Sequence, residues 1–294
     1  ASFAPKGTSL LQHGTVDYYL YGEAETIFIQ FCDLFLNNNS EFKKNFQEKY
    51  IICPPNENLN PLPIPDFTDY FDQKEKLWFF NNHSIVFESS RGCWHGSSKQ
   101  CSFCGHQKEY MTYREKDREK TKTELETLIR IYKPEKVYSA DFIMPKHLPT
   151  FFKDIKIIPE KTQLFYEVSP QLSYTELNTL KNNNITRIQS GLETFSDDLL
   201  VLLQKGTNSI NNLRFLRDCE SLSINIYWNF LHSIPEESPK HYEAIRNVLP
   251  HIYHLHPPFD VRPITITRYS PLYNQLQTRE PTNLTYYDSF EYIF

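Results

Sequence analysis

The sequence predicts an α/β fold in which short parallel strands alternate with helices, and two observations lead to this prediction. From residue 84 onward, β-type runs alternate with segments whose apolar residues recur at helical spacing. Strands that alternate with helices pair in parallel through right-handed crossovers. Six such strands are too few for a closed eight-stranded barrel, so we expect an open, partial (β/α)6 TIM-like barrel or a doubly wound sheet.

The elements follow one another in a regular order. Strands are expected over residues 84–89, 136–141, 163–168, 186–191, 224–231 and 261–267. Helices are expected over 119–132, 148–155, 173–183, 196–206, 208–222 and 238–249. Ser173 with Glu176 forms a capping-box pattern, Ser196 precedes two Asp residues, and Ser238 precedes a proline, so all three serines are expected as helix N-caps. Ligands of such a sheet bind at the carboxyl ends of its strands.

The first 83 residues have a different pattern. "VDYYLYGEAETIFIQFCDLFL" (16–36) predicts a strand, a turn and a helix, and residues 1–39 are expected to end a separate domain. Residues 40–83, which include "PPNENLNPLPIPDFTDYF", are expected to form an extended linker. Residues 84–294 then form the main domain. The sequence has no initiator Met and no closing element, which predicts a fragment of a longer protein.

Composition excludes several classes of protein. The 294 residues carry 31 basic and 36 acidic side chains, for a net charge of −5, which argues against a protein that binds nucleic acid through its phosphates. No apolar run reaches the length of a membrane span, and we expect neither a membrane segment nor a signal peptide. Three of the six cysteines lie within twelve positions, a clustering that favours a metal site in a reducing cytoplasm.

The stretch "ESSRGCWHGSSKQCSFCG" (88–105) holds these three cysteines, Cys93, Cys101 and Cys104, directly after the first strand. A structural zinc site needs four ligands, which His95 or His106 could complete. An iron–sulfur cluster normally uses four cysteines, so three would leave one iron open to bind another ligand. The residues alone leave both alternatives open.

The same stretch resembles the cluster loop of radical S-adenosylmethionine (SAM) enzymes, with seven residues between the first two cysteines instead of the usual three. "CWHG" and "CSFCG" are similar to the "CWWG" and "CTFCG" of the branch that matures ribosomally made peptides (RiPPs). The resemblance continues in order through "YSADFIM", "FYEVSPQLS", "RIQSGLETFSDDLLVLLQKGTN", "WNFLHSIPEE" and "RYSPLY". "VDYYLYGEAE" (16–25) resembles the end of the Rossmann-like cobalamin-binding domain that precedes many such cores.

The resemblance implies a radical SAM core whose three cysteines hold a [4Fe–4S] cluster, with SAM on the open iron. Cleavage of SAM would give a 5′-deoxyadenosyl radical that abstracts a hydrogen atom from an unactivated carbon. A reductant such as flavodoxin or ferredoxin would be a partner. By position the resemblance assigns SAM contacts to seven residues: Phe103, Ser139, Ala140, Asp141, Glu167, Gln189 and Glu193.

Three functions are consistent with this resemblance and with the residues. Cobalamin-dependent C-methylation of a ribosomally made precursor peptide is favoured by the cobalamin-domain phrases, although the family's Asp-x-His-x-x-Gly cobalamin loop does not occur in the sequence. Peptide epimerisation, which needs a hydrogen donor such as a cysteine, is the alternative. A zinc-stabilised binding module is the alternative outside this chemistry. In place of the family's "G-x-P-G-E" turn the sequence has "SIPEE" (233–237), so a close approach of this backbone to a ligand is not expected.

Overall fold

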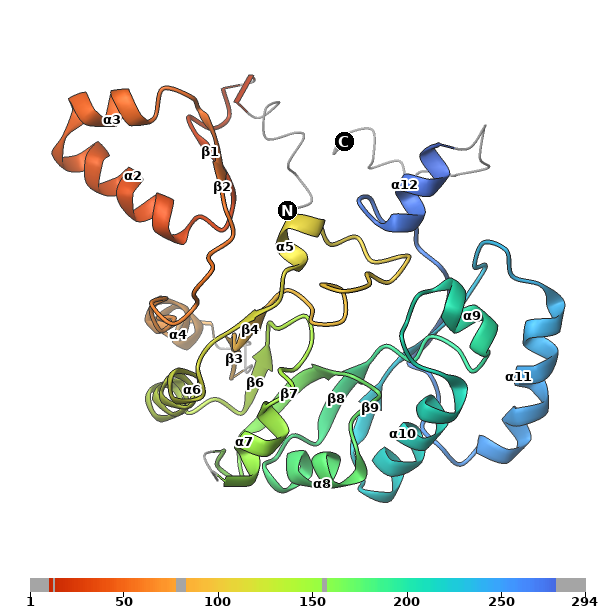
Figure 1. The fold of residues 1–294 in the computed structure, drawn as a ribbon. Coiled ribbons are helices and arrows are strands. Elements are labelled where there is room, and N and C mark those ends of the chain that lie inside the picture. The colour runs from red at the N-terminus through yellow and green to blue at the C-terminus, as the bar shows by residue number, and fades with distance from the viewer. Residues whose placement is uncertain (1–10, 13, 78–82, 155–157, 279–294) are drawn as a thin grey trace. The chain divides into compact units, whose positions relative to one another are not determined.

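The computed structural model describes residues 11–12, 14–77, 83–154 and 158–278 (Figure 1). These residues belong to two compact units, and the division falls between Glu57 and Asn58. Each unit is described separately below. Among the described helices, none has both the length and the apolar character needed to cross a lipid bilayer.

The first unit contains one β-α-β arrangement. Its two parallel strands are β1 (Tyr19–Gly22) and β2 (Tyr50–Cys53), and the helices α2 (Glu25–Asn37) and α3 (Asn39–Asn45) connect them. Phe31 and Phe42 join the two helices, with ring centroids 4.9 Å apart. The predicted strand, turn and helix over 16–36 are therefore confirmed.

The predicted linker over 40–83 differs from the structure. Most of α3 and all of β2 lie inside it, and α4 (Thr68–Glu75) forms further along. The sequence signal was weak because β2 has four residues and α3 has seven, and both are stabilised by contacts with the rest of their unit. Phe71 of α4 packs against another element: it stacks on Tyr132 of α6 (Arg118–Tyr132), with ring centroids 5.1 Å apart.

The second unit is built around a five-stranded parallel sheet of order β3-β6-β7-β8-β9. Its strands are β3 (Ser84–Phe87), β6 (Lys136–Ser139), β7 (Gln163–Val168), β8 (Arg187–Ser190) and β9 (Asn225–Tyr227). All neighbouring pairs are parallel, as the alternation of strands and helices predicts. The α/β fold with a parallel sheet is confirmed.

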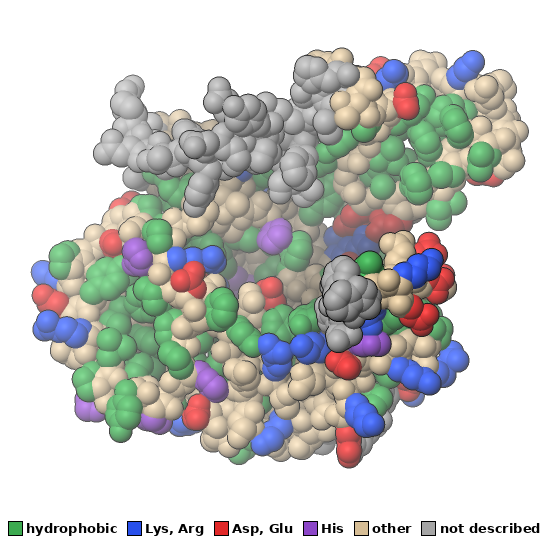
Figure 2. Space-filling view, turned by 180° about the vertical axis from the view of Figure 1, so that it is seen from behind, with side chains coloured by type: hydrophobic (Ala, Val, Ile, Leu, Met, Phe, Trp, Pro, Cys, Tyr) green, Lys and Arg blue, Asp and Glu red, His purple; other side chains and the backbone are tan. Residues whose placement is uncertain are grey.

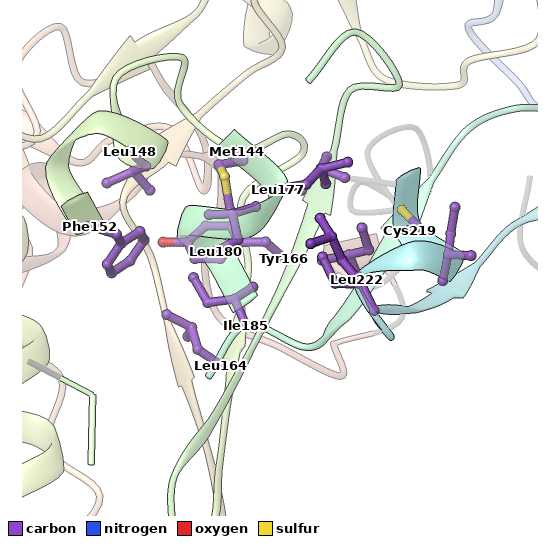
Figure 3. Packing of buried hydrophobic residues seen from close by; sticks show 14 of the residues in the cluster. Met144, Leu148, Phe152, Leu164, Tyr166, Leu177, Leu180, Ile185, Cys219 and Leu222 are labelled. Carbon is purple, nitrogen blue, oxygen red and sulfur yellow. The ribbon is translucent and has the colours of Figure 1, made fainter. Parts of the chain in front are cut away.

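Helices cover one side of this sheet, as Figure 1 shows. They are α6 (Arg118–Tyr132), α7 (Leu148–Asp154), α8 (Tyr174–Asn182) and α10 (Ser209–Ser221), while α9 (Asp197–Leu202), α11 (Pro239–Ile252) and α12 (Pro271–Gln277) follow later strands. The core between sheet and helices contains Leu164 and Tyr166 of β7, Leu180 of α8 and Cys219 of α10, all fully buried (Figure 3). This core fixes the strand ends on which the site depends.

Helices begin at all three predicted N-caps, Ser173, Ser196 and Ser238, and one of these helices differs in length from the prediction. The Glu176 N–H donates to the Ser173 Oγ, and the Ser173 N–H donates to the Glu176 carboxylate at 2.8 Å, so the capping box is confirmed. Ser196 accepts a hydrogen bond from the Leu199 N–H. The helix that begins there, expected to reach residue 206, ends at Leu202 because the backbone enters left-handed conformations just beyond it.

The fifth and sixth predicted strands are also arranged differently. The expected strand 224–231 is interrupted at Trp228, which is buried in the core, and continues as β10 (Asn229–His232). The sixth strand, expected over 261–267, is β11 (Asp260–Pro263) and pairs in parallel with β10. The six-strand series is therefore present, with its last pair separated from the main sheet by a bend in the fifth strand.

Short secondary elements flank the cysteine loop. The antiparallel pair β4 (Ser90–Arg91) and β5 (Arg114–Glu115) encloses it, and the one-turn helix α5 (Lys108–Met111) ends it. On the face that Figure 2 shows, acidic, basic and hydrophobic side chains are interspersed over the second unit.

Candidate cofactor-binding site

The cysteine loop begins at a position that only glycine can occupy. Gly92 has a φ of 76°, and a Cβ there would lie 2.7 Å from the Met111 carbonyl oxygen. The Cys93 N–H donates to this same carbonyl at 3.1 Å, and the Ser97 hydroxyl donates to it at 2.9 Å. The first cysteine is therefore held at the base of the loop by backbone contacts with the segment that ends the loop.

The seven residues between Cys93 and Cys101 form hydrogen-bonded turns. The Ser97 N–H donates to the Cys93 carbonyl at 2.7 Å, and the Lys99 N–H donates to the His95 carbonyl at 2.9 Å. Because these turns shorten the path, the longer gap still returns the chain to the same cavity.

Side chains and backbone groups of the loop bind two other segments of the chain, the one that follows β6 and the one that follows α9. The Trp94 Nε1–H donates to the Met144 carbonyl at 3.2 Å, and the His95 Nε2 lies 3.0 Å from the Gln204 carbonyl oxygen. The Ser102 N–H donates to the Leu203 carbonyl at 3.0 Å. The loop is thus fixed to the segments that follow β6 and α9, rather than attached at its two ends alone.

All ten residues that the sequence assigns to the site line one cavity of about 670 Å³ at the carboxyl ends of the strands. These are Cys93, Cys101, Cys104, Phe103, Ser139, Ala140, Asp141, Glu167, Gln189 and Glu193. They come from the loop after β3 and from the ends of β6, β7 and β8. The volume lies within the range of about 300–1,000 Å³ that is usual for ligand sites. The structure therefore brings the assigned residues together; their individual roles remain predictions.

The three thiols lie in the wall of one cavity. Among the described residues, no group of three His, Cys, Asp or Glu side chains that could hold one metal ion is found. In an iron–sulfur cluster, cysteine thiolates are the usual ligands of the irons. Cys93, Cys101 and Cys104 lie close enough to interact electrostatically.

Burial governs the chemistry of these thiols. Removal from water raises the pKa of all three, as expected for thiols in a cavity wall. The Gly96 N–H donates to the Cys93 sulfur at 3.4 Å and opposes this increase in pKa. Backbone N–H groups aimed at sulfur stabilise a thiolate and the cluster it binds.

Lys205 is a cavity residue that our sequence reasoning did not identify. Its Nζ lies 3.1 Å from the Glu193 Oε1 and 5.6 Å from the centre of the Phe103 ring. Burial acts to lower the pKa of Lys205, but Glu193 and the thiols of Cys101 and Cys93 outweigh it and the pKa is raised. Lys205 is therefore a cation held beside the cysteines.

Local backbone geometry explains why Lys205 enters the cavity. It lies between Gln204 and Gly206, both of which have positive φ, so the chain turns sharply after α9. Gly191 leaves the space for the ion pair, because a Cβ there would overlap the Lys205 amine and lie 2.6 Å from the Glu193 carboxylate. In the sequence Lys205 resembles an ordinary cation near a helix end, so only the folded chain identifies it.

The acidic residues of the cavity differ in what binds them. Glu193 forms an ion pair with Lys205. Glu167 is the register partner of Gln189, and burial raises the pKa of its carboxyl while Lys205 partly offsets this effect. Asp141 is almost fully buried and accepts hydrogen bonds from the backbone N–H of Ser89, at 2.7 Å.

Asp141 therefore binds the backbone at the start of the cysteine loop in addition to lining the cavity. The N–H of Ser90 also donates to it, at 3.1 Å, and so does the Ser89 hydroxyl. Burial raises the pKa of Asp141 to about 6, although these hydrogen bonds act to lower it. The carboxylate joins the end of β6 to the start of the cysteine loop.

An aromatic wall completes the cavity. The His106 and Phe142 rings are stacked with centroids 3.8 Å apart, and both line the cavity near Cys104. Burial lowers the pKa of His106. Flat rings of this kind are suited to planar groups such as an adenine or an aromatic side chain.

The turn "SIPEE" keeps the backbone that glycine would favour. Ser233 and Glu236, at the two positions where the family motif has glycine, have φ values of 59° and 73°. The Glu237 carboxylate accepts hydrogen bonds from the N–H of Ser233 and of Ile234. The turn is thus stabilised by a side chain instead of by glycine.

A parallel α/β core with a cysteine loop and a polar cavity at its strand ends defines a cofactor-dependent α/β protein. The family model of the radical SAM superfamily matches residues 87–249, more than half of the chain. The chain therefore belongs to the radical SAM superfamily, whose domain implies a [4Fe–4S] cluster and SAM as cofactors.

Solved structures support the fold. The cobalamin-dependent SAM radical enzyme OxsB, with aqua-cobalamin and SAM bound, is 17% identical with a TM-score of 0.56, over 95% of this chain and 49% of that chain. The radical SAM methyltransferase TsrM from Kitasatospora setae, with cobalamin and a [4Fe–4S] cluster bound, is 16% identical with a TM-score of 0.52, over 65% of this chain and 36% of that one. At these identities the likeness concerns the fold.

One relative with a known function matches over a shorter part of this chain. The heme chaperone HemW of Buchnera aphidicola subsp. Acyrthosiphon pisum is 27% identical over 94 residues, which is 32% of this chain and 25% of that protein. The chain spans less than half the length of each of these three proteins.

Proposed function

We propose that this chain is the catalytic core of a radical SAM enzyme that methylates a carbon atom of a ribosomally made precursor peptide with the help of cobalamin. The observation that carries the proposal is the single cavity lined by the three cysteines and by all seven residues assigned to SAM. When bound, the cluster and SAM supply a radical able to abstract hydrogen from carbon, and cobalamin supplies the methyl group.

Several residues of the cavity then have a definite role. Cys93, Cys101 and Cys104 hold the cluster, and the turns between them keep the loop closed. Lys205 provides the buried positive charge that a carboxylate of SAM requires, and Glu193 keeps that charge in place at 3.1 Å. Glu167 and Gln189, on neighbouring strands, present hydrogen-bonding groups for ribose or amine.

The cobalamin part of the proposal is supported by the cobalamin-bound neighbours and by the β-α-β unit that precedes the core. No Asp-x-His-x-x-Gly loop occurs in this sequence, so none of its residues is assigned as a cobalamin ligand. Epimerisation remains the alternative to methylation. The three cysteines outside the loop do not line the cavity; Cys219 lies in the core, and Cys32 and Cys53 lie in the first unit. The family assignment does not support a zinc-stabilised module.

The test is anaerobic reconstitution of the chain with iron and sulfide, followed by reduction in the presence of SAM, with and without cobalamin. We expect a brown protein that forms 5′-deoxyadenosine, with S-adenosylhomocysteine appearing only when cobalamin is present. Deoxyadenosine without any dependence on cobalamin would favour epimerisation. A colourless protein that forms neither product would contradict the proposal.

A further inference from the structure

The five-stranded sheet has a second face that none of the helices in the described part of the chain covers. Val86, Tyr138, Phe165, Arg187 and Asn225 are successive register partners from β3 to β9, so they form one row across this face. Their apolar neighbours in sequence point the other way and are buried in the core, among them Ile85, Val137, Leu164 and Ile188. The row itself is exposed or half-buried.

Aromatic rings make this face continuous. We call Tyr138, Phe165, Tyr227 and Phe259 the aromatic row. Neighbouring ring centroids in it lie 5.6, 6.4 and 5.8 Å apart, in tilted or edge-on contact. Its two ends are open, since Phe259 is 75% exposed and Val86, next to Tyr138, is 50% exposed. Apolar side chains of this size, left uncovered in a row, indicate a binding surface.

A cation lies within the aromatic row. Arg187 donates from Nη2 to the Tyr227 hydroxyl, and its guanidinium carbon lies 5.3 Å from the centre of the Tyr227 ring. Its Nε is buried and has no hydrogen-bond partner among the described residues. Because the Nε is out of reach of a docked molecule, the donors that remain are on the two terminal nitrogens, and these suit a carboxylate, which a guanidinium can bind through two N–H groups.

This surface adjoins the cofactor cavity along two strands. Glu167 follows Phe165 by two residues on β7, and Gln189 follows Arg187 by two on β8. Residues two apart on a strand share a face and lie about 7 Å from each other. Both Glu167 and Gln189 line the cavity. A molecule on the aromatic row therefore lies one layer of side chains below the proposed site of SAM.

We propose that the uncovered face is the docking surface for the substrate peptide, and that it selects a segment with aromatic side chains and an internal acidic side chain bound to Arg187. This inference rests on the proposed function. The acid is a side chain rather than a chain end because apolar surface continues on both sides of Arg187, through Tyr138 on one side and Tyr227 on the other. The positive charge of Arg187 within this apolar surface is complementary to the negative charge of an acidic side chain flanked by aromatic ones.

Calorimetric titration of the reconstituted, SAM-loaded protein with two capped pentapeptides tests the proposal. The probes are acetyl-Ala-Phe-Asp-Phe-Ala-amide and the same peptide with Asn in place of Asp. We expect the Asp peptide to bind about 10-fold more tightly, the effect of a hydrogen bond to a charged group. Arg187→Met should remove the preference, and Arg187→Lys should retain part of it. The control is Arg130→Met, on the exposed side of α6, which should keep the full preference.

Three outcomes would overturn the docking proposal. One is equal binding, or no binding, of the two peptides by the wild-type protein. Another is a preference that survives in a folded Arg187→Met protein. The third is a peptide with a free terminal carboxylate and no acidic side chain that binds as tightly as the Asp peptide. Measurement of 5′-deoxyadenosine in the same samples separates these failures, because a protein that forms it but does not discriminate keeps the proposed radical chemistry and loses the docking surface.

Discussion

The two faces of the central sheet have opposite characters although the same strands make both. On the helix-covered face, Ile85, Leu164 and Ile188 are at most 2% exposed. On the other face, Val86 and Tyr138 are exposed, and the polar cavity lies above them. Parallel sheets are usually apolar on both faces. A parallel sheet with alternating burial therefore indicates that the uncovered face is kept for ligands.

Loss of a cysteine should have the largest effect on cluster binding and activity, and it should leave the fold unchanged. We expect Cys104→Ala to abolish the absorbance of the reconstituted cluster near 400 nm and to reduce 5′-deoxyadenosine formation at least 100-fold. The far-ultraviolet circular dichroism should stay unchanged, because Cys104 lies in a loop outside the sheet core. Cys32→Ala, in the first unit, is the matched control and should retain both signals. Cleavage of SAM by the Cys104 variant would contradict the ligand assignment.

Breaking the Lys205–Glu193 pair should have the next largest effect. Lys205→Met leaves the Glu193 carboxylate buried without its cation, which typically costs about 3–5 kcal/mol of stability. The combined Lys205→Met and Glu193→Gln variant should recover most of this loss, because neither charge is then left uncompensated. Urea denaturation of the wild-type protein, both single variants and the double variant measures the coupling. Additive losses in the double variant would show that the pair is not coupled.

Adjacent residues of β3 allow a direct comparison of the two faces. Ile85→Ala creates a cavity in the helix-covered core and should lower the free energy of unfolding by about 2–5 kcal/mol. Val86→Ala, one residue further on the uncovered face, should cost less than about 1 kcal/mol because half of its side chain is already in water. Urea denaturation of both variants gives the difference. Equal losses would mean that the second face is covered in solution.

The smallest expected effect concerns pH and Asp141. Burial raises its pKa from 3.8 to about 6 in the folded state, so folding favours the protonated form. The resulting stabilisation is complete below pH 3.8 and is lost as the pH rises through about 6. Between pH 5 and pH 7.5 the wild-type protein should lose about 1.4 kcal/mol relative to Asp141→Asn. Urea midpoints at both pH values test this; parallel changes in the two proteins would contradict the raised pKa.

Much of the fold was predictable from local patterns. The strand over 163–168 has the expected bounds, and the helix capped by Ser173 begins where the capping box predicts. Both elements are predicted by their own residues: the strand by its β-branched and aromatic composition, and the helix by its N-terminal capping box. The short elements α3 and β2 were missed, because four to seven residues carry too weak a pattern and contacts within their unit decide their conformation.

The candidate site was predictable where residue type and order carried the information. The cysteines and the polar strand-end residues all line one cavity, since parallel strands end at the same edge of the sheet. Lys205 and Arg187 could not be identified in this way. Lys205 enters the cavity because Gln204 and Gly206 turn the backbone, and Arg187 gains its importance from rings on the neighbouring strands.

By itself, the sequence determined the alternation of strands and helices, the three-cysteine loop and the end of the sheet at which the loop lies. These properties follow from periodicity and chain order, which depend on residues close in sequence. The tertiary structure decided which cation lies beside the cysteines, how the carboxylate of Asp141 is bound, and which face of the sheet stays uncovered. Those properties depend on residues far apart in the chain, because burial and charge pairing arise only when the strands and helices pack together.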